Sequence, residues 1–352
     1  MPLNCNRFGI LPVATLKDIS DELGVSVATV SRALNGFPEV NARTRNRVQE
    51  AATRLGYRPN RVAQRLVTGR SGMVGMIVKI KPDMSADQTF FEVLTGLTAA
   101  LSAHETDLVL AVDQEADPVL SYKRLLERNI LDGFILNAPV SNDPRVDFLL
   151  SEGIPFVLHG QDRPNPSYAF YDIDNIGVAA DAVNLLVNLG HHRIALMNGD
   201  LRYAYAVDRQ TGYRAAMHRH DLDDLAVNGG ASTTQGYAEA LALLAGPRPT
   251  AFICATTVIA EAVICAVRDR GLRVPQDISV IAHDDALPRT RADNFNPALT
   301  VTRAPLRDAC APLADLLVDR LNGKPANACQ TLAKADLILR GSTAPAPKEL
   351  SC

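Results

Sequence analysis

Two pairs of adjacent residues, Asp284 with Asp285 and His191 with His192, are the groups in this sequence best suited to acid–base or metal chemistry. An enzyme could use the two carboxyl groups as an acid and a nucleophile, or the two imidazoles as metal ligands. Adjacent residues point in different directions on a helix or a strand, so neither pair would form a preorganised site. The sequence also lacks the G-x-G-x-x-G, phosphate-loop, G-x-S-x-G and H-E-x-x-H motifs. We therefore predict a protein without catalytic activity, metal or cofactor.

Polar residues that follow apolar stretches are better placed to bind a small molecule. Asp284 comes after the apolar strand predicted at 279–283, and a carboxylate at such a strand end is well placed to bind vicinal hydroxyl groups. Similar positions, at the end of a strand or the start of a helix, are occupied by Gln88, Phe90, Phe91, His159, Gln161 and Arg303. Each phenylalanine could stack on a sugar ring or belong to the core. These residue types favour a sugar as the bound molecule.

A different chemistry is predicted for residues 15–66, which are rich in helix caps and arginines. Leu16, Ile19 and Leu23 have the spacing of the apolar stripe of a short helix. Thr15 can cap the N-terminus of this helix, and Gly24 can adopt the positive φ of the turn that ends it. The sequence therefore predicts a short helix followed by a tight turn.

A second helix follows this turn. Ser26 is placed to cap it, Val30 and Leu34 point inward, and the outward residues are Val27, Ala28, Ser31 and Arg32. This pattern predicts a helix-turn-helix, whose second helix enters the major groove of DNA. An outward arginine can bind guanine with two hydrogen bonds, while small apolar side chains contact thymine methyl groups.

A third helix is predicted at 44–55, capped near Asn41, with Val48, Ala51, Ala52 and Leu55 closing a small core. The segment 61–66 is too short to form a stable isolated helix, so we expect it to order only when docked on DNA. Leu66 would then act as an apolar wedge between base steps in the minor groove.

Charge is distributed unevenly along the 352 residues. Residues 1–70 contain 11 Lys and Arg and 5 acidic residues, a net charge of +6, whereas the rest contains 25 and 34, a net charge of −9. A basic module on an acidic body is typical of a protein that binds a polyanion with one end. The six cysteines form no C-x-x-C pair, no stretch is long enough to span a membrane, and residues 1–14 do not resemble a signal peptide. We expect a cytoplasmic protein with a disordered extension at 1–14.

From residue 71 the pattern changes to alternating strands and helices. Strands are predicted at 72–78, 107–111, 133–137 and 155–159, with helices at 91–101, 120–128 and 148–152. A second set has strands at 193–197, 225–227, 251–254 and 277–281, and helices at 177–189, 209–220, 236–244 and 259–270. The fold class is therefore a small all-α helix-turn-helix domain followed by a two-lobed α/β core with parallel sheets. Ligands of such sheets bind at the carboxyl ends of the strands.

The stretches 15–19, 24–26, 29–36, 55–60 and 63–66 closely resemble the DNA-binding headpiece and hinge of the LacI/GalR family of transcriptional repressors. The resemblance implies that Val27, Ala28 and Arg32 read bases in the major groove and that Leu66 enters the minor groove. It implies this full set of DNA-binding residues: Thr15, Leu16, Ser26, Val27, Ala28, Thr29, Ser31, Arg32, Asn35, Thr44, Tyr57, Asn60, Arg61, Ala63, Gln64 and Leu66.

Residues 72–341 resemble the periplasmic-binding-protein-like effector core of the same family, which implies that Arg209 and Asp284 contact the effector. The sequence departs from the family pattern where Thr256 and Thr257 replace a common Asn-Asp pair and Ala304 replaces a common glutamine. Residues 156–160 and 302–306 are similar to repressors of α-glucoside uptake genes. The predicted effector site comprises Gln88, Phe90, Phe91, His159, Gln161, Arg209, Thr256, Asp284 and Arg303.

The resemblance also implies a domain organisation: a headpiece at 15–59, a hinge helix and linker at 60–70, and a core at 71–341. Crossings near 171–172, 296–297 and 332 would divide the core into lobe 1 (about 71–171 and 298–331) and lobe 2 (about 172–297 and 332–341). Residues 342–352 are expected to be a disordered tail. Because this tail lacks the apolar heptads of a tetramerisation helix, we expect a homodimer.

These features predict a mechanism of regulation. Two headpieces would occupy the half-sites of a pseudopalindromic operator in double-stranded DNA, and an effector would change the angle between the lobes and loosen the hinge segments. A repressor released by a mono- or disaccharide is the first expectation. An activator, or a regulator with a nucleobase corepressor, would use the same elements. A secreted sugar-binding protein would share the core but lack residues 15–66.

Overall fold

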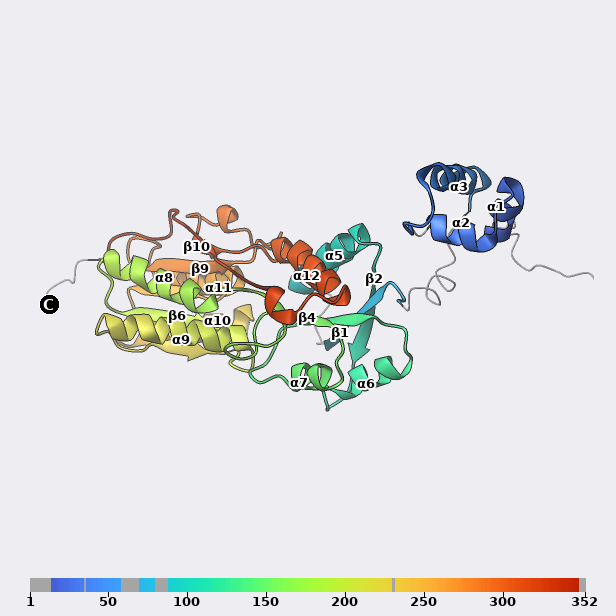
Figure 1. Cartoon of the computed structure of the whole chain (residues 1–352). Coiled ribbons are helices and arrows are strands. Elements are labelled where there is room, and N and C mark those ends of the chain that lie inside the picture. Colours follow the sequence, from blue (N-terminus) through green and yellow to red (C-terminus); the bar gives the residue numbers. More distant parts are fainter. Residues whose placement is uncertain (1–13, 35, 58–69, 80–87, 230–231, 348–352) are drawn as a thin grey trace, which may run out of the picture. The chain divides into compact units, whose positions relative to one another are not determined.

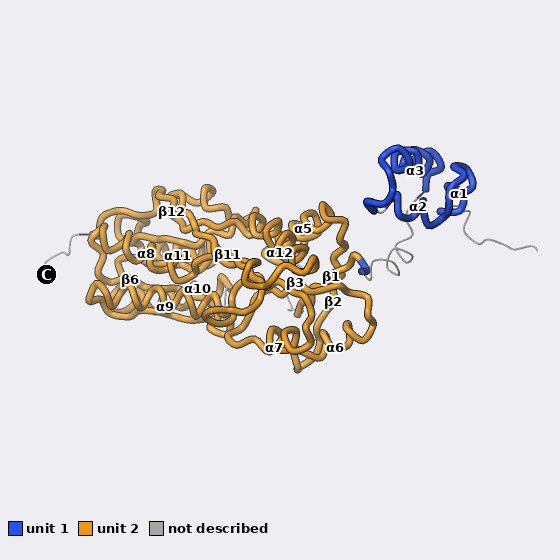
Figure 2. The backbone as a smooth tube through the Cα atoms, viewed as in Figure 1, with its two compact units in different colours: residues 1–71 blue, residues 72–352 orange. Residues whose placement is uncertain are grey.

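The computed structural model describes residues 14–34, 36–57, 70–79, 88–229 and 232–347. Contacts divide the chain into two compact units, residues 1–71 and residues 72–352 (Figure 2). We call them the headpiece unit and the core unit, and each is described by itself.

The headpiece unit contains the helices α1 (Leu16–Leu23), α2 (Val27–Leu34) and α3 (Ala42–Leu55) (Figure 1). Thr15 and Asp18 cap α1 reciprocally, and Gly24 ends it with a φ of 66°. The buried core comprises Ile19, Val30, Ala33, Val40, Val48, Ala51 and Ala52. Leu55, predicted to belong to this core, is 36% exposed at the end of α3. The predicted helix-turn-helix is otherwise present.

Two six-stranded sheets form the core unit, with the strand orders β11-β5-β4-β3-β1-β2 and β12-β10-β9-β8-β6-β7. We call the parts built on the first and second sheets lobe 1 and lobe 2. Every strand pair is parallel except that of β12 with β10. The strands are β1 (Met73–Lys79), β2 (Asp107–Asp113), β3 (Gly133–Asn137), β4 (Phe156–His159), β5 (Ala169–Ile173), β6 (Ile194–Asn198), β7 (Ala226–Asn228), β8 (Ala251–Cys254), β9 (Ser279–Asp284), β10 (Thr300–Arg303), β11 (Gln330–Ala333) and β12 (Asp336–Ile338).

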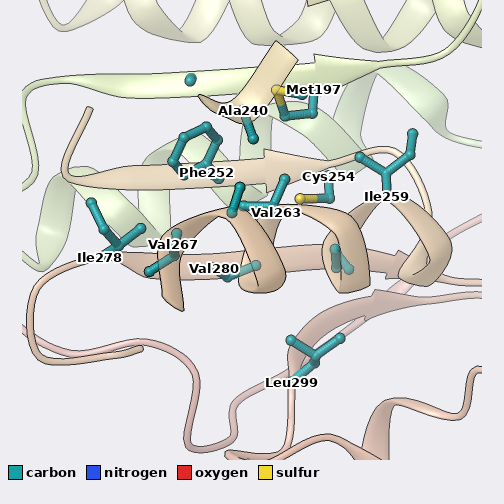
Figure 3. Close-up of a cluster of buried hydrophobic side chains, with 14 of the residues drawn as sticks. Met197, Ala240, Phe252, Cys254, Ile259, Val263, Val267, Ile278, Val280 and Leu299 are labelled. Carbon is teal, nitrogen blue, oxygen red and sulfur yellow. The ribbon is translucent and has the colours of Figure 1, made fainter. Parts of the chain in front are cut away.

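Helices cover both faces of each sheet. In lobe 1, α5 (Gln88–Ala103) and α12 (Cys310–Leu321) pack on one face, and α6 (Leu120–Glu127) and α7 (Pro144–Ser151) on the other. In lobe 2, α8 (Asn175–Asn188) and α9 (Ala204–Arg219) pack on one face, and α10 (Thr233–Ala245) and α11 (Thr257–Asp269) on the other. Figure 3 shows the core on the α11 side, where Phe252, Val263 and Val280 meet. Burial on both faces explains why these strands are almost continuously apolar. Short 3-10 helices are η2 (Ala292–Asn294), η3 (Leu306–Ala309) and η4 (Ala326–Ala328).

The chain crosses between the lobes three times. The first crossing lies between β5 of lobe 1 and α8 of lobe 2. The second follows β10, because Thr300 of β10 is opposite Ile281 of β9, so the predicted crossing at 296–297 is wrong. The family resemblance placed this crossing too early, because the chain stays in lobe 2 through β10 before it enters lobe 1. The third crossing lies between β11 of lobe 1 and β12 of lobe 2.

Residues 342–347 pack against lobe 2, which contradicts the predicted disordered tail over this range. Ser342 is completely buried, where its Oγ donates to the carbonyl oxygen of Val280 at 2.6 Å and accepts the N–H of Thr300 at 2.8 Å. The N–H of Ala346 donates to the carbonyl oxygen of Leu189 at 2.8 Å. Two prolines suggested disorder by composition, but the tertiary contacts of Ser342 and of the backbone hold this segment in place.

Replacing Ser342 by alanine is expected to reduce the free energy of unfolding by about 1–3 kcal/mol, because the buried N–H of Thr300 loses its acceptor. Urea unfolding measures this change. Ser102→Ala, at an exposed position of α5, is the matched control and should stay within about 0.5 kcal/mol of the wild type. A similarly small change in both variants would show that the segment from 342 does not support the fold.

None of the described helices is long and apolar enough to cross a membrane. Four cysteines lie within the described residues, and all four are free thiols: Cys254, Cys265, Cys310 and Cys329.

Candidate DNA-binding surface and interlobe polar cluster

The outward face of α2 carries the residues predicted to read DNA bases. Val27 is 43% exposed, and Ala28 and Arg32 are also exposed, while Val30 and Ala33 are buried in the headpiece core. Ser26 Oγ accepts the N–H of Thr29 at 3.1 Å and so caps the helix. The amphipathic pattern thus places a guanidinium and small apolar groups on one surface. Helix-turn-helix proteins insert such a surface into the major groove.

The other predicted DNA-binding residues have varied environments. Thr15 and Thr44 lie at the N-terminal ends of α1 and α3, where helices favour phosphate groups. Leu16 and Tyr57 are half-buried against the headpiece core, so they also stabilise the fold. Thr29 and Ser31 are half-buried on α2. Asn35, Asn60, Arg61, Ala63, Gln64 and Leu66 lie outside the described residues.

In the core unit, Arg209 on α9 joins several elements of lobe 2. It is 6% exposed, its Nε donates to Asn175 Oδ1 at 2.9 Å, and its Nη1 donates to the carbonyl oxygen of Ala255 at 2.8 Å. The guanidinium carbon lies 5.4 Å from the centre of the Tyr205 ring. No described residue accepts a hydrogen bond from Nη2. Two nitrogens of the fork are therefore fixed, and the third can donate to a bound molecule.

Asp285 and two histidines complete a polar cluster around Arg209. The Asp285 side chain is 20% exposed, and its Oδ1 lies 3.4 Å from His283 Nε2, which has no hydrogen-bond partner at closer range. Burial raises the pKa of Asp285, but the side chain of His283 and the charge of Arg209 lower it by more, so the carboxyl group is ionised at neutral pH. Burial lowers the pKa of His159 to about 4 and also lowers that of His283, so both imidazoles are neutral.

This cluster includes side chains from both lobes. His159 ends β4 in lobe 1, whereas Arg209, His283 and Asp285 belong to lobe 2. Asp172 of β5 and Asn175 of α8 join it at the first crossing between the lobes. We call these six residues the interlobe cluster. They lie at the carboxyl ends of strands or at helix N-termini, with Arg209 on the second turn of α9.

Asp284 has a different environment from the one predicted. It is 1% exposed, its Oδ2 accepts a hydrogen bond from Arg303 Nη1 at 2.7 Å, and its Oδ1 accepts the N–H of Ala286 at 2.8 Å. Asp284 and Arg303 thus form an ion pair with each other, and Asp285 takes the place facing Arg209. The contact of Asp284 with an effector therefore stays a prediction. Successive residues at a strand end point to opposite sides, so a register difference of one residue exchanges the two carboxylates.

The remaining predicted effector residues lie at several places. Gln88 Oε1 accepts the N–H of Arg289 at 2.9 Å and so connects α5 of lobe 1 with lobe 2. Phe90 and Phe91 contact each other edge to face, and Phe91 is 48% exposed. Thr256 caps α11. The N–H of Gln161 stabilises the carboxylate of Asp172. Among the nine predicted residues, His159 and Arg209 belong to the interlobe cluster and Gln161 adjoins it.

Three residues of the interlobe cluster were not among the predicted effector residues: Asp172, Asn175 and Asp285. Asp172 lies on β5, a strand that was not predicted, and Asn175 is the first residue of α8. The sequence feature that could have indicated Asp172 and Asn175 is the largely polar stretch 171–175, which directly follows the apolar residues at 169–170. The residues described by the structure contain no group of three or more His, Cys, Asp or Glu side chains arranged to hold a metal ion.

Comparison with known proteins identifies the family. The family model for bacterial regulatory proteins of the lacI family matches residues 15–60, and that for the periplasmic binding protein-like domain matches residues 183–343. The HTH-type transcriptional regulator AglR of Rhizobium meliloti (strain 1021) is 41% identical over 342 residues, covering 96% of each chain. The chain belongs to the LacI family of transcriptional regulators. As a member of this family it is a DNA-binding regulator and not an enzyme.

Other LacI-family proteins agree over nearly the full length. The HTH-type transcriptional regulator RafR of Escherichia coli is 31% identical over 338 residues, covering 95% of this chain and 99% of its own. The solved transcriptional regulator CelR–cellobiose complex has a TM-score of 0.68 and 29% identity, covering 94% of this chain and 99% of its own. The lac repressor dimer bound to operator and the anti-inducer ONPF has a TM-score of 0.75 at 24% identity, with the same coverage. The predicted fold class is confirmed.

Proposed function

We propose that this LacI-family regulator is a homodimeric repressor that is released from a pseudopalindromic operator by a disaccharide bound beside Arg209. The main support is the interlobe cluster, in which two nitrogens of the Arg209 fork are fixed and Nη2 donates to no described residue. Asp285 supplies acceptor oxygens nearby, and His159 Nδ1 is buried without a hydrogen-bond partner. Such convergent donors and acceptors suit the hydroxyl groups of a sugar.

The aromatic residues beside Arg209 favour the same class of ligand. Tyr203 and Tyr205 stack with ring centres 5.8 Å apart at an angle of 12°, and Tyr205 lies under the Arg209 guanidinium. Amphipathic rings of this kind combine an apolar face with a hydroxyl group, as sugars do. CelR, which resembles this chain over nearly its full length, is described in complex with the disaccharide cellobiose. The similarity of residues 156–160 and 302–306 to repressors of α-glucoside uptake genes adds α-glucosides to the candidates.

Control of DNA binding would follow from the position of the cluster between the lobes. A ligand held by His159 of lobe 1 and by Arg209 of lobe 2 contacts both residues at only one angle between the lobes. Its binding therefore favours that angle over others. The headpieces then lose their spacing on the two half-sites. A coupling free energy of about 1–3 kcal/mol would lower operator affinity by roughly 5- to 150-fold. The lac repressor, which shares this fold, is described as a dimer bound to operator.

A thermal-shift screen tests the proposal with cellobiose, maltose, sucrose, trehalose and glucose, and with adenine and guanine as controls. A disaccharide at 100 times its Kd is expected to stabilise the protein by about 2.7 kcal/mol, which gives a clear rise in Tm. The same sugar should then release the protein from its operator in a mobility-shift assay. Stabilisation by a nucleobase, with no response to any sugar, would contradict the carbohydrate assignment and leave the DNA-binding function intact.

A further inference from the structure

Two buried polar residues, Asp172 and Asn175, connect strand β5 of lobe 1 to the guanidinium fork of Arg209. Asp172 Oδ1 on β5 accepts hydrogen bonds from the N–H of Ile173 at 2.8 Å and from Asn175 Nδ2 at 3.2 Å. Asn175 Oδ1 accepts a hydrogen bond from Arg209 Nε at 2.9 Å. Asp172, Asn175 and Arg209 are 8%, 4% and 6% exposed. We call this hydrogen-bonded series the Asp172 relay.

The relay depends on which way the Asn175 amide points. Its NH₂ group must face Asp172 and its oxygen must face Arg209, because Arg209 Nε can only donate. An ionised Asp172 can only accept, so it holds the NH₂ group on its own side. A protonated Asp172 carries a hydroxyl donor that competes with this arrangement. The charge of Asp172 therefore determines how firmly Asn175 presents its oxygen to Arg209.

We propose that Asp172 is a positioning residue for the effector: acting through Asn175, its carboxylate orients the Arg209 fork and ties it to lobe 1. This inference rests on the proposed binding of the effector beside Arg209. Arg209 is then held directly by lobe 2, through the carbonyl oxygen of Ala255 after β8, and indirectly by lobe 1, through Asn175 and Asp172 of β5. A change in the angle between the lobes moves one of these attachments relative to the other. Effector affinity and lobe orientation are thereby coupled through a single guanidinium.

The groups that face Asp172 make its charge sensitive to pH near neutrality. Burial raises the pKa of Asp172 to about 7, with a further increase from the carboxylate of Asp208 on α9. The N–H groups of Ile173 and Gln161 and the guanidinium of Arg209 oppose this rise. Asp208 itself has a raised pKa from burial and from Asp174, and Asp285 also acts on the Arg209 guanidinium. Asp172 and Asp285 thus both act on the Arg209 guanidinium, and Asp208 adds a further carboxylate that acts on Asp172.

The expected consequence is an effector affinity that depends on pH. Above pH 7 Asp172 is ionised, and the relay holds the fork in place. As the pH falls through about 7, protonation loosens the relay, and affinity decreases by at most about tenfold per pH unit. The effector-free protein should show the opposite trend: a carboxyl pKa raised by folding stabilises the folded state at low pH, and that contribution is lost as the pH rises through 7.

Asp172→Asn is the central variant, because it keeps the shape and removes the titration. Binding of cellobiose and maltose is measured by calorimetry between pH 5.5 and 8.5. The wild type should bind whichever of these sugars it recognises more weakly at low pH, whereas Asp172→Asn should show no such pH dependence. Asn175→Ala should weaken binding roughly tenfold at pH 8, because Arg209 Nε loses its acceptor. Asp181→Asn, at an exposed carboxylate of α8, is the control and should retain the wild-type profile.

A second measurement does not depend on any sugar. The ¹⁵Nε resonance of Arg209, assigned by its absence in Arg209→Lys, is followed against pH in effector-free protein. It should shift as the pH passes through about 7 in the wild type and stay constant in Asp172→Asn. If it titrates identically in both proteins, or in neither, the positioning role of Asp172 is refuted. If it behaves as expected while no sugar binds, the relay stands and the sugar assignment fails.

Discussion

Arg209→Lys is expected to retain operator binding but to lose release by the effector. Lysine keeps the charge but has no planar fork, so it cannot donate to Asn175, to Ala255 and to a ligand at once. Loss of one or two charge-assisted hydrogen bonds at about 1.5–3 kcal/mol each should weaken effector binding by at least about tenfold and by up to roughly twenty thousand-fold. The measurement is a mobility shift with operator DNA across increasing concentrations of the sugar found in the thermal screen.

The matched control is Arg214→Lys on the same helix. Arg214 is exposed and pairs with Asp224 at 2.6 Å, so its replacement should leave the release curve unchanged. Urea unfolding of both variants shows whether a loss of response reflects a loss of folding. Normal release of a folded Arg209→Lys protein would place the effector elsewhere in the core unit.

Arg32→Ala should have the largest effect on the choice of DNA sequence. Arg32 is exposed in the last turn of α2, and a bidentate contact with guanine contributes about 1–3 kcal/mol of discrimination. The ratio of affinities for an operator selected by the wild type and for random DNA is therefore expected to fall roughly 5- to 150-fold. Competition binding at a fixed salt concentration measures this ratio.

Arg65→Ala provides the comparison for this experiment. Arg65 lies outside the described residues, and we predict from the sequence that it contacts phosphate groups. Its replacement should weaken binding to all sequences alike and reduce the salt dependence by about one phosphate contact. If both variants reduced operator and random-DNA affinity equally, α2 would not be the base-reading helix.

Most of the fold could be predicted because its signals are local. The headpiece is defined within about 45 residues by helix caps at Thr15 and Asn41 and by the turn at Gly24. Each of its three helices buries an apolar side, which includes Ile19, Val30 and Val48 on successive helices. The apolar runs of the core similarly predicted β1, β3, β4 and β8 to within a residue or two. Helix starts were less accurate, since α7 begins at Pro144 after its cap Asp143, four residues before the prediction.

The predictions that failed depend on contacts between distant residues. The second crossing was misplaced because β10 is assigned to lobe 2 by its pairing with β9. The segment from Ser342 resembled a tail because its partners, Val280 and Thr300, are far away in the sequence. The family resemblance placed the crossing and composition favoured a disordered tail, but long-range hydrogen bonds determined both outcomes.

The sequence by itself determined that the protein has a DNA-binding helix-turn-helix, a two-lobed α/β core and an arginine suited to binding a polar ligand. Helix caps, turn glycines and hydrophobic periodicity act over a few residues, so they can be recognised without the fold. Only the tertiary structure decided that Asp285, rather than Asp284, faces Arg209 and that Asp172 reaches it through Asn175. Strand register and the packing of α8 on α9 bring these groups together, and both arise from interactions that no short stretch of sequence contains.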